Sequence, residues 1–501
     1  MFLEQNLREM ELSREAYWLR YPATSPVKLR WRALTFRHSF HVLPGETILE
    51  LGAGSGLWTE HLAHVLRDEN PITGVVFNRQ LLRESKRNCT RFQHVEDLAR
   101  DLLPESFDYV IGTAILCHNG YERNLRTLYR LLKPGGQLLF FEANYWNPQV
   151  ALKGAIPWLG RKTGNAPCQL GLRRYKLMKI ASRQGFTEID AIPYDIIHPG
   201  TPRSLVYSFQ SVAFIAEHTP VIREMCGTLY IRARKPGGPA ARSSVNLATH
   251  SWLFRSVSFV IPCHNEEMNI PRLVDGILGF YGPYVREILI VNDNSTDHTG
   301  EVADQIARRE PLVKVLNRQP PNGVGRALRE GYSAATGTYI LTMDCDFVEL
   351  LPEFRDLFDA VAAGHDGAIG SRFSHESLLI NYPFFKILCN RSFHLLVNAL
   401  LPLRVRDTSN NLKLYKAEIL KSIEIEENHF AANVETGLKP LLAGYDLAEV
   451  PISWINRTID MGSSSFRIVN VAPDYFRSLL RLSSRRGRRR VTRTAQGGPA
   501  L

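Results

Sequence analysis

The sequence lacks the features that mark several classes of protein. No apolar run reaches the roughly 18 residues that a membrane-spanning helix needs, and the first twenty residues mix acids with apolar residues, unlike a signal peptide. No two of the seven cysteines form a CxxC pair, which argues against a zinc site or a disulfide framework and indicates a reducing compartment. We therefore expect a cytoplasmic protein whose membrane contact, if any, is peripheral and on the inner face.

Positive charge is concentrated near the end of the chain. The formal net charge is +11 at pH 7, and eight arginines lie from Arg477 to Arg493 without an intervening acid. The preceding segment, APDYFRSLLRLSS, is typical of a helix in a membrane interface. Anionic membrane is the preferred partner of Arg477–Arg493, because each arginine near such a surface contributes about 1 kcal/mol. A solvated tail ranks second. Nucleic acid ranks last, because no aromatic residues alternate with the arginines.

Two regions alternate strand and helix patterns, which predicts an α/β protein with two domains. The first domain covers residues 1–236, with helices expected over 1–43 and an irregular insertion over 145–205. Residues 237–256 are rich in Pro, Gly, Ser and Ala without a period and are predicted to form a linker. The second domain covers residues 257–470, and residues 471–501 form a basic amphipathic tail.

Strands of the second domain end in polar residues. The segments concerned are VSFVIPCHNEE, ILIVNDNSTD, NGVGRALREG and YILTMDCD. Ligands of open α/β sheets bind at the carboxyl ends of strands. Asp344 and Asp346 alternate with Cys345 and so point the same way, and two such carboxylates can hold Mg²⁺ or Mn²⁺ against a diphosphate leaving group. Asp293 can accept hydrogen bonds from a nucleobase.

These segments, in this order, resemble family-2 inverting glycosyltransferases of the GT-A nucleotide-sugar-binding fold. Within that family the domain is most similar to dolichyl- and polyprenyl-phosphate mannosyl- and glucosyltransferases. The resemblance implies a UDP- or GDP-sugar donor, with a lipid phosphate or a glycan or metabolite hydroxyl as acceptor. It implies a nucleotide-sugar site formed by Pro262, Asn265, Glu266, Asp293, Asp344, Asp346 and Arg457, with Asp344 and Asp346 also holding the metal.

Three downstream segments resemble the lipid-phosphate subgroup: IGSRF, RDTSNNLKLY and EVPISWINRTIDMGSSSF. Through them Arg372 and Asp407 join Asp346 as candidate catalytic residues, and Arg372 becomes a candidate phosphate ligand, as does Arg457. Ser465 stands where the subgroup often has lysine, so the acceptor stays open. A hydroxyl acceptor needs a general base, for which Asp407 is the candidate. A lipid phosphate is already an anion, and Asp407 would then organise the site.

The first domain contains a strand that runs into a glycine-rich turn, ILELGAGSG, followed by FDYVIGTAILCH and LLKPGGQLLFFE. Glycines there let a nucleoside approach the backbone closely. Residues 44–142 resemble class I S-adenosylmethionine methyltransferases, which have a Rossmann-like fold. The resemblance implies that the cofactor is held by Glu50, Gly52, Gly54 and Gly56, with Asp97 or Glu96 beside its adenine.

One position departs from that family. Val76 stands at the end of the second strand, where the family has an acid that holds the ribose, and Asn78 is the nearby substitute. His118 is the candidate base for methyl transfer to a hydroxyl of a small molecule, sugar or lipid. Two functions therefore remain open: a bifunctional enzyme, or a glycosyltransferase carrying an inactive methyltransferase-like module that binds a partner.

Overall fold

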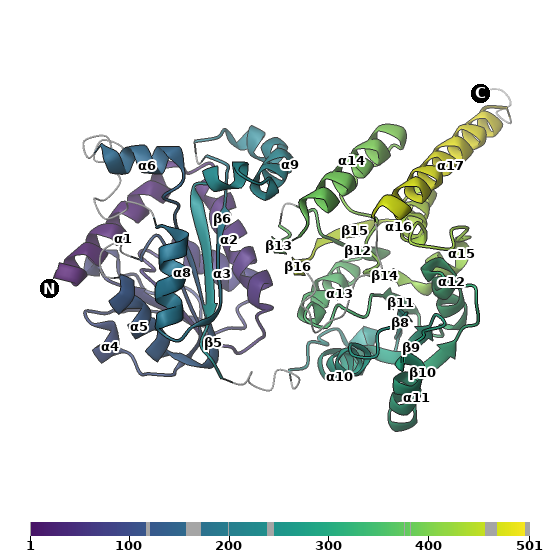
Figure 1. The fold of residues 1–501 in the computed structure, drawn as a ribbon, viewed down its shortest axis with the longest axis horizontal. Coiled ribbons are helices and arrows are strands. Elements are labelled where there is room, and N and C mark those ends of the chain that lie inside the picture. The colour runs from purple at the N-terminus through teal and green to yellow at the C-terminus, as the bar shows by residue number, and fades with distance from the viewer. Residues whose placement is uncertain are drawn as a thin grey trace. The chain divides into compact units, whose positions relative to one another are not determined.

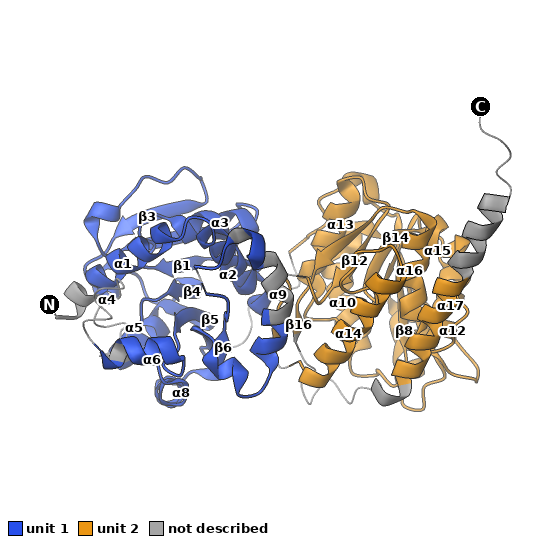
Figure 2. Cartoon of the chain, turned by 90° about the horizontal axis from the view of Figure 1, so that it is seen from above, with its two compact units in different colours: residues 1–242 blue, residues 243–501 orange. Residues whose placement is uncertain are grey.

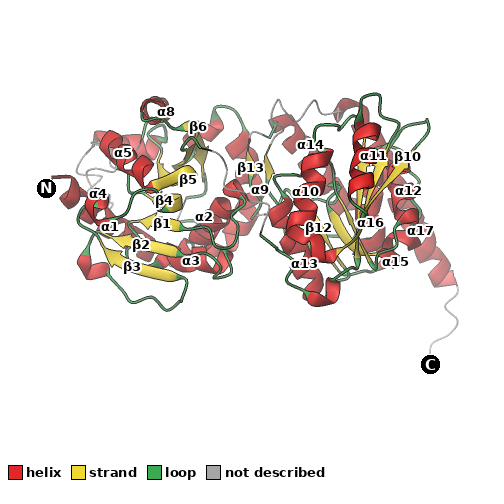
Figure 3. Cartoon of the chain, turned by 90° about the horizontal axis from the view of Figure 1, so that it is seen from below, coloured by secondary structure: helices red, strands yellow, loops and turns green. Residues whose placement is uncertain are grey.

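The computed structural model divides the chain into two compact units, residues 1–242 and 243–501 (Figure 2). It describes residues 2–116, 121–156, 172–198, 200–237, 245–374, 376–380, 382–455 and 468–495. Each unit contains a seven-stranded sheet with helices on both faces (Figure 3). The predicted α/β class and both predicted folds, a methyltransferase fold and a GT-A fold, are confirmed.

The sheet of the first unit has the strand order β3-β2-β1-β4-β5-β7-β6. Its strands from β3 to β5 are parallel, and β7 is antiparallel to both of its neighbours. The strands are β1 Ile48–Leu51, β2 Ile72–Val76, β3 Thr90–His94, β4 Phe107–Thr113, β5 Leu132–Ala143, β6 Thr187–Tyr194 and β7 Thr228–Arg234. The central β1 is buried throughout, as expected of a parallel strand covered on both faces.

Alternate side chains of β1 enter different cores. Leu49 joins a core with α5 (Tyr121–Leu131) and α8 (Arg174–Arg183), whereas Ile48 joins a core with α2 (Ser25–Phe40) and α3 (Leu57–Val65). Helix α1 (Phe2–Arg20) contributes to both cores. It places Met10 in the first and Trp18 in the second. Helix α1 therefore passes across the edge of the sheet, where β1, β2 and β4 end.

The segment 145–205 is more regular than its sequence suggests. It contains α6 (Pro148–Ala155), α8 and β6, the last of which is an edge strand paired with β7; α9 (Arg203–His218) follows. Both edge strands, β3 and β6, were missed by the sequence patterns. Their sequences, TRFQH and TEIDAIPY, are largely polar or contain proline, which an edge strand tolerates because one side of it is not paired.

The sheet of the second unit has the order β10-β9-β8-β11-β14-β12-β15. Strands β10, β9, β8 and β11 are parallel, so three of the predicted polar segments meet at one edge. The strands are β8 Val257–Cys263, β9 Val285–Asn292, β10 Val313–Asn317, β11 Tyr339–Thr342, β12 Gly367–Ser371, β14 Lys413–Lys416 and β15 Leu447–Pro451. A separate pair joins β13 (Leu379–Ile380) to β16 (Trp454–Ile455).

Helices cover both faces of this sheet. Helices α12 (Val324–Ala334), α15 (Ala417–Ser422) and α16 (Ala432–Ala443) supply a core with Val260, Leu289 and Ile340. The remaining sheet-covering helices are α10 (Ile270–Tyr281), α11 (Thr299–Arg309) and α13 (Arg355–Ala362). Part of the predicted linker packs here too: Leu253 is buried, and the Leu247 amide donates to the Phe280 carbonyl at 2.8 Å.

The predicted basic tail begins as part of this unit. Helix α17 (Ile468–Ala495), yellow in Figure 1, packs Leu479 and Leu482 against α16 and α14 (Phe384–Leu400). Arg477 pairs with Asp474, and Arg481 with Glu426. The side chains of the arginines from Arg485 onward lie outside the described part of the chain. Within the described residues, no helix is both long and apolar enough to span a membrane.

Candidate functional site

A pocket of about 510 Å³ opens in the second unit where β8, β9 and β11 end. Its other walls come from the end of β12, from α14 and from the start of α17. Residues central to its chemistry are Pro262, Glu266, Asp293, Asp344, Asp346, Arg372, Tyr382, Lys386, Asn390, Asn411, Trp454 and Tyr475. Most of the predicted nucleotide-sugar residues within the described part of the chain therefore line this one pocket, together with Arg372.

Asp344 and Asp346 lie just beyond the end of β11. Both are partly exposed and line the pocket, whereas the intervening Cys345 is buried. The Asn411 amide donates to Oδ1 of Asp344 at 2.8 Å. Among the described residues no cluster of three or more His, Cys, Asp or Glu side chains suits a metal. Two carboxylates nevertheless fit Mg²⁺, which usually takes one or two protein carboxylates and completes its shell with phosphates and water.

Asp293 follows β9 and is held rigidly. Its Oδ2 accepts the Gly323 amide at 2.6 Å, and its Oδ1 forms a close ion pair with Arg318. A carboxylate oxygen has two acceptor positions, so a nucleobase can still bond to it. Asn265, by contrast, is exposed and outside the pocket lining. Its side chain accepts the Thr296 amide at 2.8 Å and so ties together two loops at the rim.

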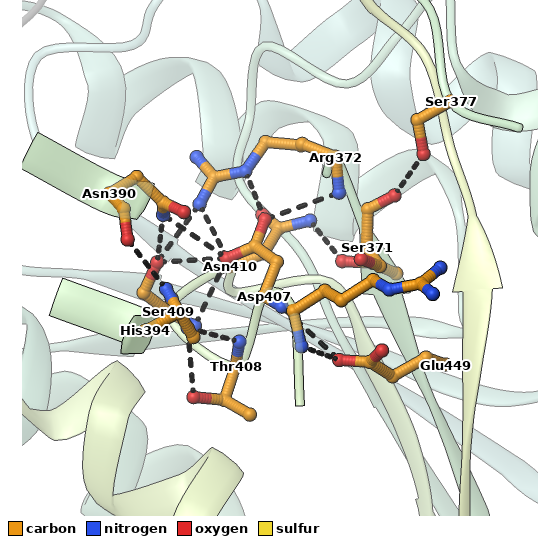
Figure 4. Close-up of polar contacts among 12 residues, drawn as sticks. Ser371, Arg372, Ser377, Asn390, His394, Asp407, Thr408, Ser409, Asn410 and Glu449 are labelled. Carbon is orange, nitrogen blue, oxygen red and sulfur yellow. Dashed lines mark hydrogen bonds and ion pairs between the residues drawn. The ribbon is translucent and has the colours of Figure 1, made fainter. Parts of the chain in front are cut away.

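Arg372 and Asp407 form a buried ion pair (Figure 4). Arg372 Nε donates to Asp407 Oδ2 at 2.7 Å, and Nη2 donates to Oδ1 at 3.0 Å. The Arg372 backbone amide and the Ser409 hydroxyl donate to the same carboxylate. Asn390 of α14 bonds to the Ser409 hydroxyl at 3.1 Å. The Ser409 backbone amide and the Asn390 side-chain amide also donate to the Asp407 carboxylate, so six donor atoms from three segments fix it.

This environment decides the protonation of the pair. Burial alone would raise the pKa of Asp407, but the charge and hydrogen bonds of Arg372 outweigh it and hold that pKa well below its ordinary value. Asp407 is fully buried and absent from the pocket lining, whereas Arg372 lines the pocket. A low-pKa carboxylate with this many donors is a poor proton acceptor, so the geometry favours the organising role of Asp407 over the role of base.

In the first unit, the glycine-rich turn lies against side chains of α1. Glu50 is buried, accepts the Thr59 hydroxyl at 2.6 Å and has a pKa raised by burial to about 7. Gly54 has φ +59°, and a side chain there would meet Glu15 at 2.7 Å. The Arg14 guanidinium similarly contacts the Gly52 carbonyl. Gly56, also at positive φ, precedes α3. A ligand can approach the backbone of this turn closely only after the Arg14 and Glu15 side chains move away from it.

Two predicted cofactor residues serve as helix caps. Asp97 Oδ1 accepts the Ala99 amide at 2.8 Å at the start of α4 (Leu98–Asp101). Asn78 Oδ1 accepts the Gln80 amide at 3.0 Å at the start of a short 3₁₀ helix, Arg79–Leu81. The backbone amide of Asn78 instead donates to Glu11 of α1 at 2.6 Å. His118 and Arg457 lie outside the described residues.

Comparison with known proteins agrees with this geometry. The model of the family Glycosyl transferase family 2 matches residues 258–423, and that of a Methyltransferase domain matches residues 48–136. Polyprenol monophosphomannose synthase of Mycolicibacterium smegmatis is 30% identical over 218 residues, 41% of this chain and 80% of that protein.

The chain belongs to glycosyl transferase family 2. Dolichol-phosphate mannosyltransferase of Pyrococcus furiosus is 28% identical over 40% of this chain, which spans 56% of that protein. A solved S-adenosylmethionine-dependent methyltransferase from Thermotoga maritima aligns with 46% of this chain and 98% of its own, at 17% identity and a TM-score of 0.32. The chain is a family-2 glycosyltransferase, as predicted, and its residues 48–136 match the model of a Methyltransferase domain, in agreement with the predicted fold of the first unit.

Several residues of the family-2 site escaped the sequence patterns. Arg318 follows the short edge strand β10, which the sequence patterns did not single out, and forms an ion pair with Asp293, which follows the neighbouring strand β9. Lys413 is buried beside the site, and its pKa is lowered by burial to about 7 although Asp407 opposes this. In the first unit, Glu11, which accepts the Gly54 amide of the glycine-rich turn, was also missed. The only hint was the spacing of Glu11, Arg14 and Glu15 on one helical face.

Proposed function

We propose that the second unit transfers a sugar from a UDP- or GDP-sugar to a polyprenyl phosphate, with inversion at the anomeric carbon. The observation that carries this proposal is one pocket lined by the carboxylates of Asp344 and Asp346 and by the guanidinium of Arg372. The carboxylates suit a metal-bound diphosphate, and the guanidinium suits a second phosphate. The names of the relatives from Mycolicibacterium smegmatis and Pyrococcus furiosus support the same acceptor class.

On the donor side, the strand ends hold the nucleotide. Pro262, Glu266 and Asp293 surround the nucleoside, and Asp293 keeps one orientation because Arg318 and Gly323 hold its oxygens. Asp344 and Asp346 would hold Mg²⁺ or Mn²⁺, which when bound neutralises charge on the departing diphosphate. The Asn411 amide bonds to Asp344 and so limits the rotation of that carboxylate.

On the acceptor side, the pocket offers positively charged side chains rather than a general base. A phosphate monoester is already ionised near neutral pH and attacks without proton removal, provided that cations dock it. Arg372 and Lys386 both line the pocket. The guanidinium carbon of Arg372 lies 5.7 Å from the centroid of the Trp454 ring. Its Nε and Nη2 donate to Asp407, which fixes the direction of the donors that remain for a phosphate. A planar guanidinium held at two points suits a phosphate better than a mobile lysine would.

The lipid chain of such an acceptor needs an apolar route. Helix α14 supplies Phe393 to the pocket and exposes Phe385, Leu395, Leu396 and Leu400 elsewhere on its surface. Helix α17 supplies Tyr475 to the pocket and exposes Phe476 and Leu480. We propose that these two helices and the arginines of Arg477–Arg493 contact an anionic membrane peripherally. Phe393–Leu403 is then both a packing and a lipid-facing segment.

The acceptor is tested by offering polyprenyl phosphate and hydroxyl acceptors in parallel with radiolabelled GDP- and UDP-sugars. We expect label to enter the lipid phosphate, in a product that mild acid hydrolyses. Label that enters only hydroxyl acceptors, in a product stable to mild acid, would contradict the lipid-phosphate assignment.

We further propose that the first unit transfers a methyl group from S-adenosylmethionine to a small molecule, sugar or lipid. When bound, this cofactor supplies an electrophilic methyl group on a sulfonium. Glu50 and the turn of Gly52 and Gly54 would hold its amino-acid end, because glycines at positive φ leave their backbone accessible once the Arg14 and Glu15 side chains that contact the turn move aside. The rival function is an inactive binding module, which is favoured by the contacts of Arg14 and Glu15 on that turn.

Isothermal titration of the full chain with S-adenosylmethionine separates the two. We expect saturable binding at one site per chain. If no heat is detected with a folded protein, the two-enzyme proposal fails and the binding-module function replaces it.

A further inference from the structure

Strand β2 of the first unit ends without an acid. Val76 is its last residue and is fully buried. In nucleoside-binding α/β folds a carboxylate near this strand end accepts a hydrogen bond from a ribose hydroxyl, and a valine side chain cannot. Asn78, the nearby substitute, carries no charge, and its side-chain oxygen uses one acceptor position to cap the Arg79–Leu81 helix.

A carboxylate nevertheless lies at this place, supplied by α1. Glu11 Oε2 accepts the backbone amides of Phe77 at 3.0 Å and Asn78 at 2.6 Å, the two residues that follow Val76. Its Oε1 accepts the Gly54 amide at 3.1 Å. Glu11 therefore bridges the end of β2 and the glycine-rich turn, which are two of the segments that a nucleoside would contact.

The position of Glu11 is imposed by the packing of α1. Met10 and Trp18 of this helix enter cores on opposite faces of the sheet, so the helix is anchored on both sides of the strand ends. Arg14, one turn further on, donates to the Thr113 carbonyl at the end of β4 at 3.0 Å. Glu11 is fully buried, and a buried carboxylate that accepts charge-assisted bonds from three amides keeps its orientation.

We propose that Glu11 is the ribose ligand of the S-adenosylmethionine site, in place of the acid missing at Val76. This inference rests on the proposed cofactor of the first unit. Oε1 accepts a single bond and keeps a free acceptor position for a ribose hydroxyl. Arg14 and Glu15 must rotate away from Gly52 and Gly54 when the cofactor enters, whereas Glu11, fixed by amides, stays.

The test is isothermal titration of the full chain with S-adenosylmethionine and S-adenosylhomocysteine, comparing wild type with Glu11→Ala and Glu11→Gln. Loss of a hydrogen bond to a charged acceptor is expected to weaken binding about 10- to 100-fold. The control is Glu9→Ala, because Glu9 is exposed on the same helix, and its affinity is expected to equal that of wild type. Thermal unfolding of each variant verifies that the unit is folded.

A rescue variant makes the test specific. Val76→Asp places an acid on the strand itself, so the double variant Glu11→Ala/Val76→Asp is expected to recover most of the lost affinity. Hydrogen exchange gives a second readout: cofactor should slow exchange at the amides of Gly54, Phe77 and Asn78 in wild type, and less so in Glu11→Gln.

Two results overturn the inference in distinguishable ways. If Glu11→Ala and Glu11→Gln bind S-adenosylmethionine as tightly as wild type or more tightly, Glu11 does not contribute to cofactor affinity and is not the ribose ligand. The proposed cofactor of the first unit would still stand. Absence of binding in folded wild type and in Val76→Asp alike would overturn the proposed cofactor, and the role of Glu11 with it.

Discussion

Replacing Asp407 by asparagine removes the charge that Arg372 faces and keeps the shape of the side chain. Asp407 is fully buried, and both of its oxygens accept bonds from the guanidinium. The Arg372 guanidinium cannot escape by deprotonation in this variant, because the ordinary pKa of arginine lies far above neutral pH. The substitution therefore leaves a buried, uncompensated cation beside the pocket.

The magnitude follows from what removing one partner of a buried pair costs. Such changes destabilise by about 3–5 kcal/mol, and each kcal/mol lowers the melting temperature of a domain of this size by about 2–4 °C. We therefore expect Asp407→Asn to lower the melting temperature of the second unit by about 6–20 °C. Sugar transfer should fall mainly through a higher KM for the phosphate acceptor, because Arg372 loses its fixed orientation.

Differential scanning calorimetry measures the first effect, and initial rates at varied acceptor measure the second. The matched control is Asp366→Asn. Asp366 accepts Lys416 Nζ at 2.7 Å but is partly exposed, so its loss should cost no more than about 1 kcal/mol. The double variant Arg372→Gln/Asp407→Asn should regain part of the lost stability, because no buried charge remains unpaired.

A different pattern would refute this reasoning. If Asp407→Asn melts like Asp366→Asn but loses kcat with an unchanged acceptor KM, then Asp407 acts in the chemical step as a base. The acceptor would then be a hydroxyl, and the lipid-phosphate assignment would fall with it.

Three further predictions concern separate parts of the chain. Asp346→Asn should abolish metal-dependent sugar transfer, as should a chelator, without changing S-adenosylmethionine binding; retained transfer would contradict the proposed metal site. Burial raises the pKa of Glu142 from its ordinary 4.5 to about 8, so the folded state binds more protons and the stability contributed by this group falls as pH rises from about 4.5 to 8. Glu142→Gln keeps the acceptor oxygen for the Ile115 and Leu116 amides. In urea unfolding, the free energy of unfolding of this variant relative to wild type should therefore be higher at pH 9 than at pH 6. The same difference between variant and wild type at both pH values would refute the raised pKa of Glu142. Leu395→Asp should reduce sedimentation with anionic vesicles and leave the melting temperature unchanged, because Leu395 is 72% exposed; undiminished sedimentation would exclude this face of α14 as the contact.

Much of the fold could be read from local patterns. Strands such as β4 (FDYVIGT) and β8 (VSFVIPC) are mainly apolar because both faces of the sheet are covered, which makes them recognisable in the sequence. The polar edge strands β3 and β6 carry no such pattern, so they emerged only from pairing in the structure.

The candidate sites divide in the same way. By itself the sequence determined that Asp293, Asp344 and Asp346 lie at one sheet edge, because each directly follows a strand or lies a few residues beyond it, and parallel strands bring their ends together. It could not determine the surroundings of Asp407 and Glu11. Those depend on Arg372, 35 residues away, and on the Gly54 amide, 43 residues away. Whether a carboxylate acts as a base, a positioning group or a ligand is set by the donors around it, and only tertiary packing brings those donors into contact.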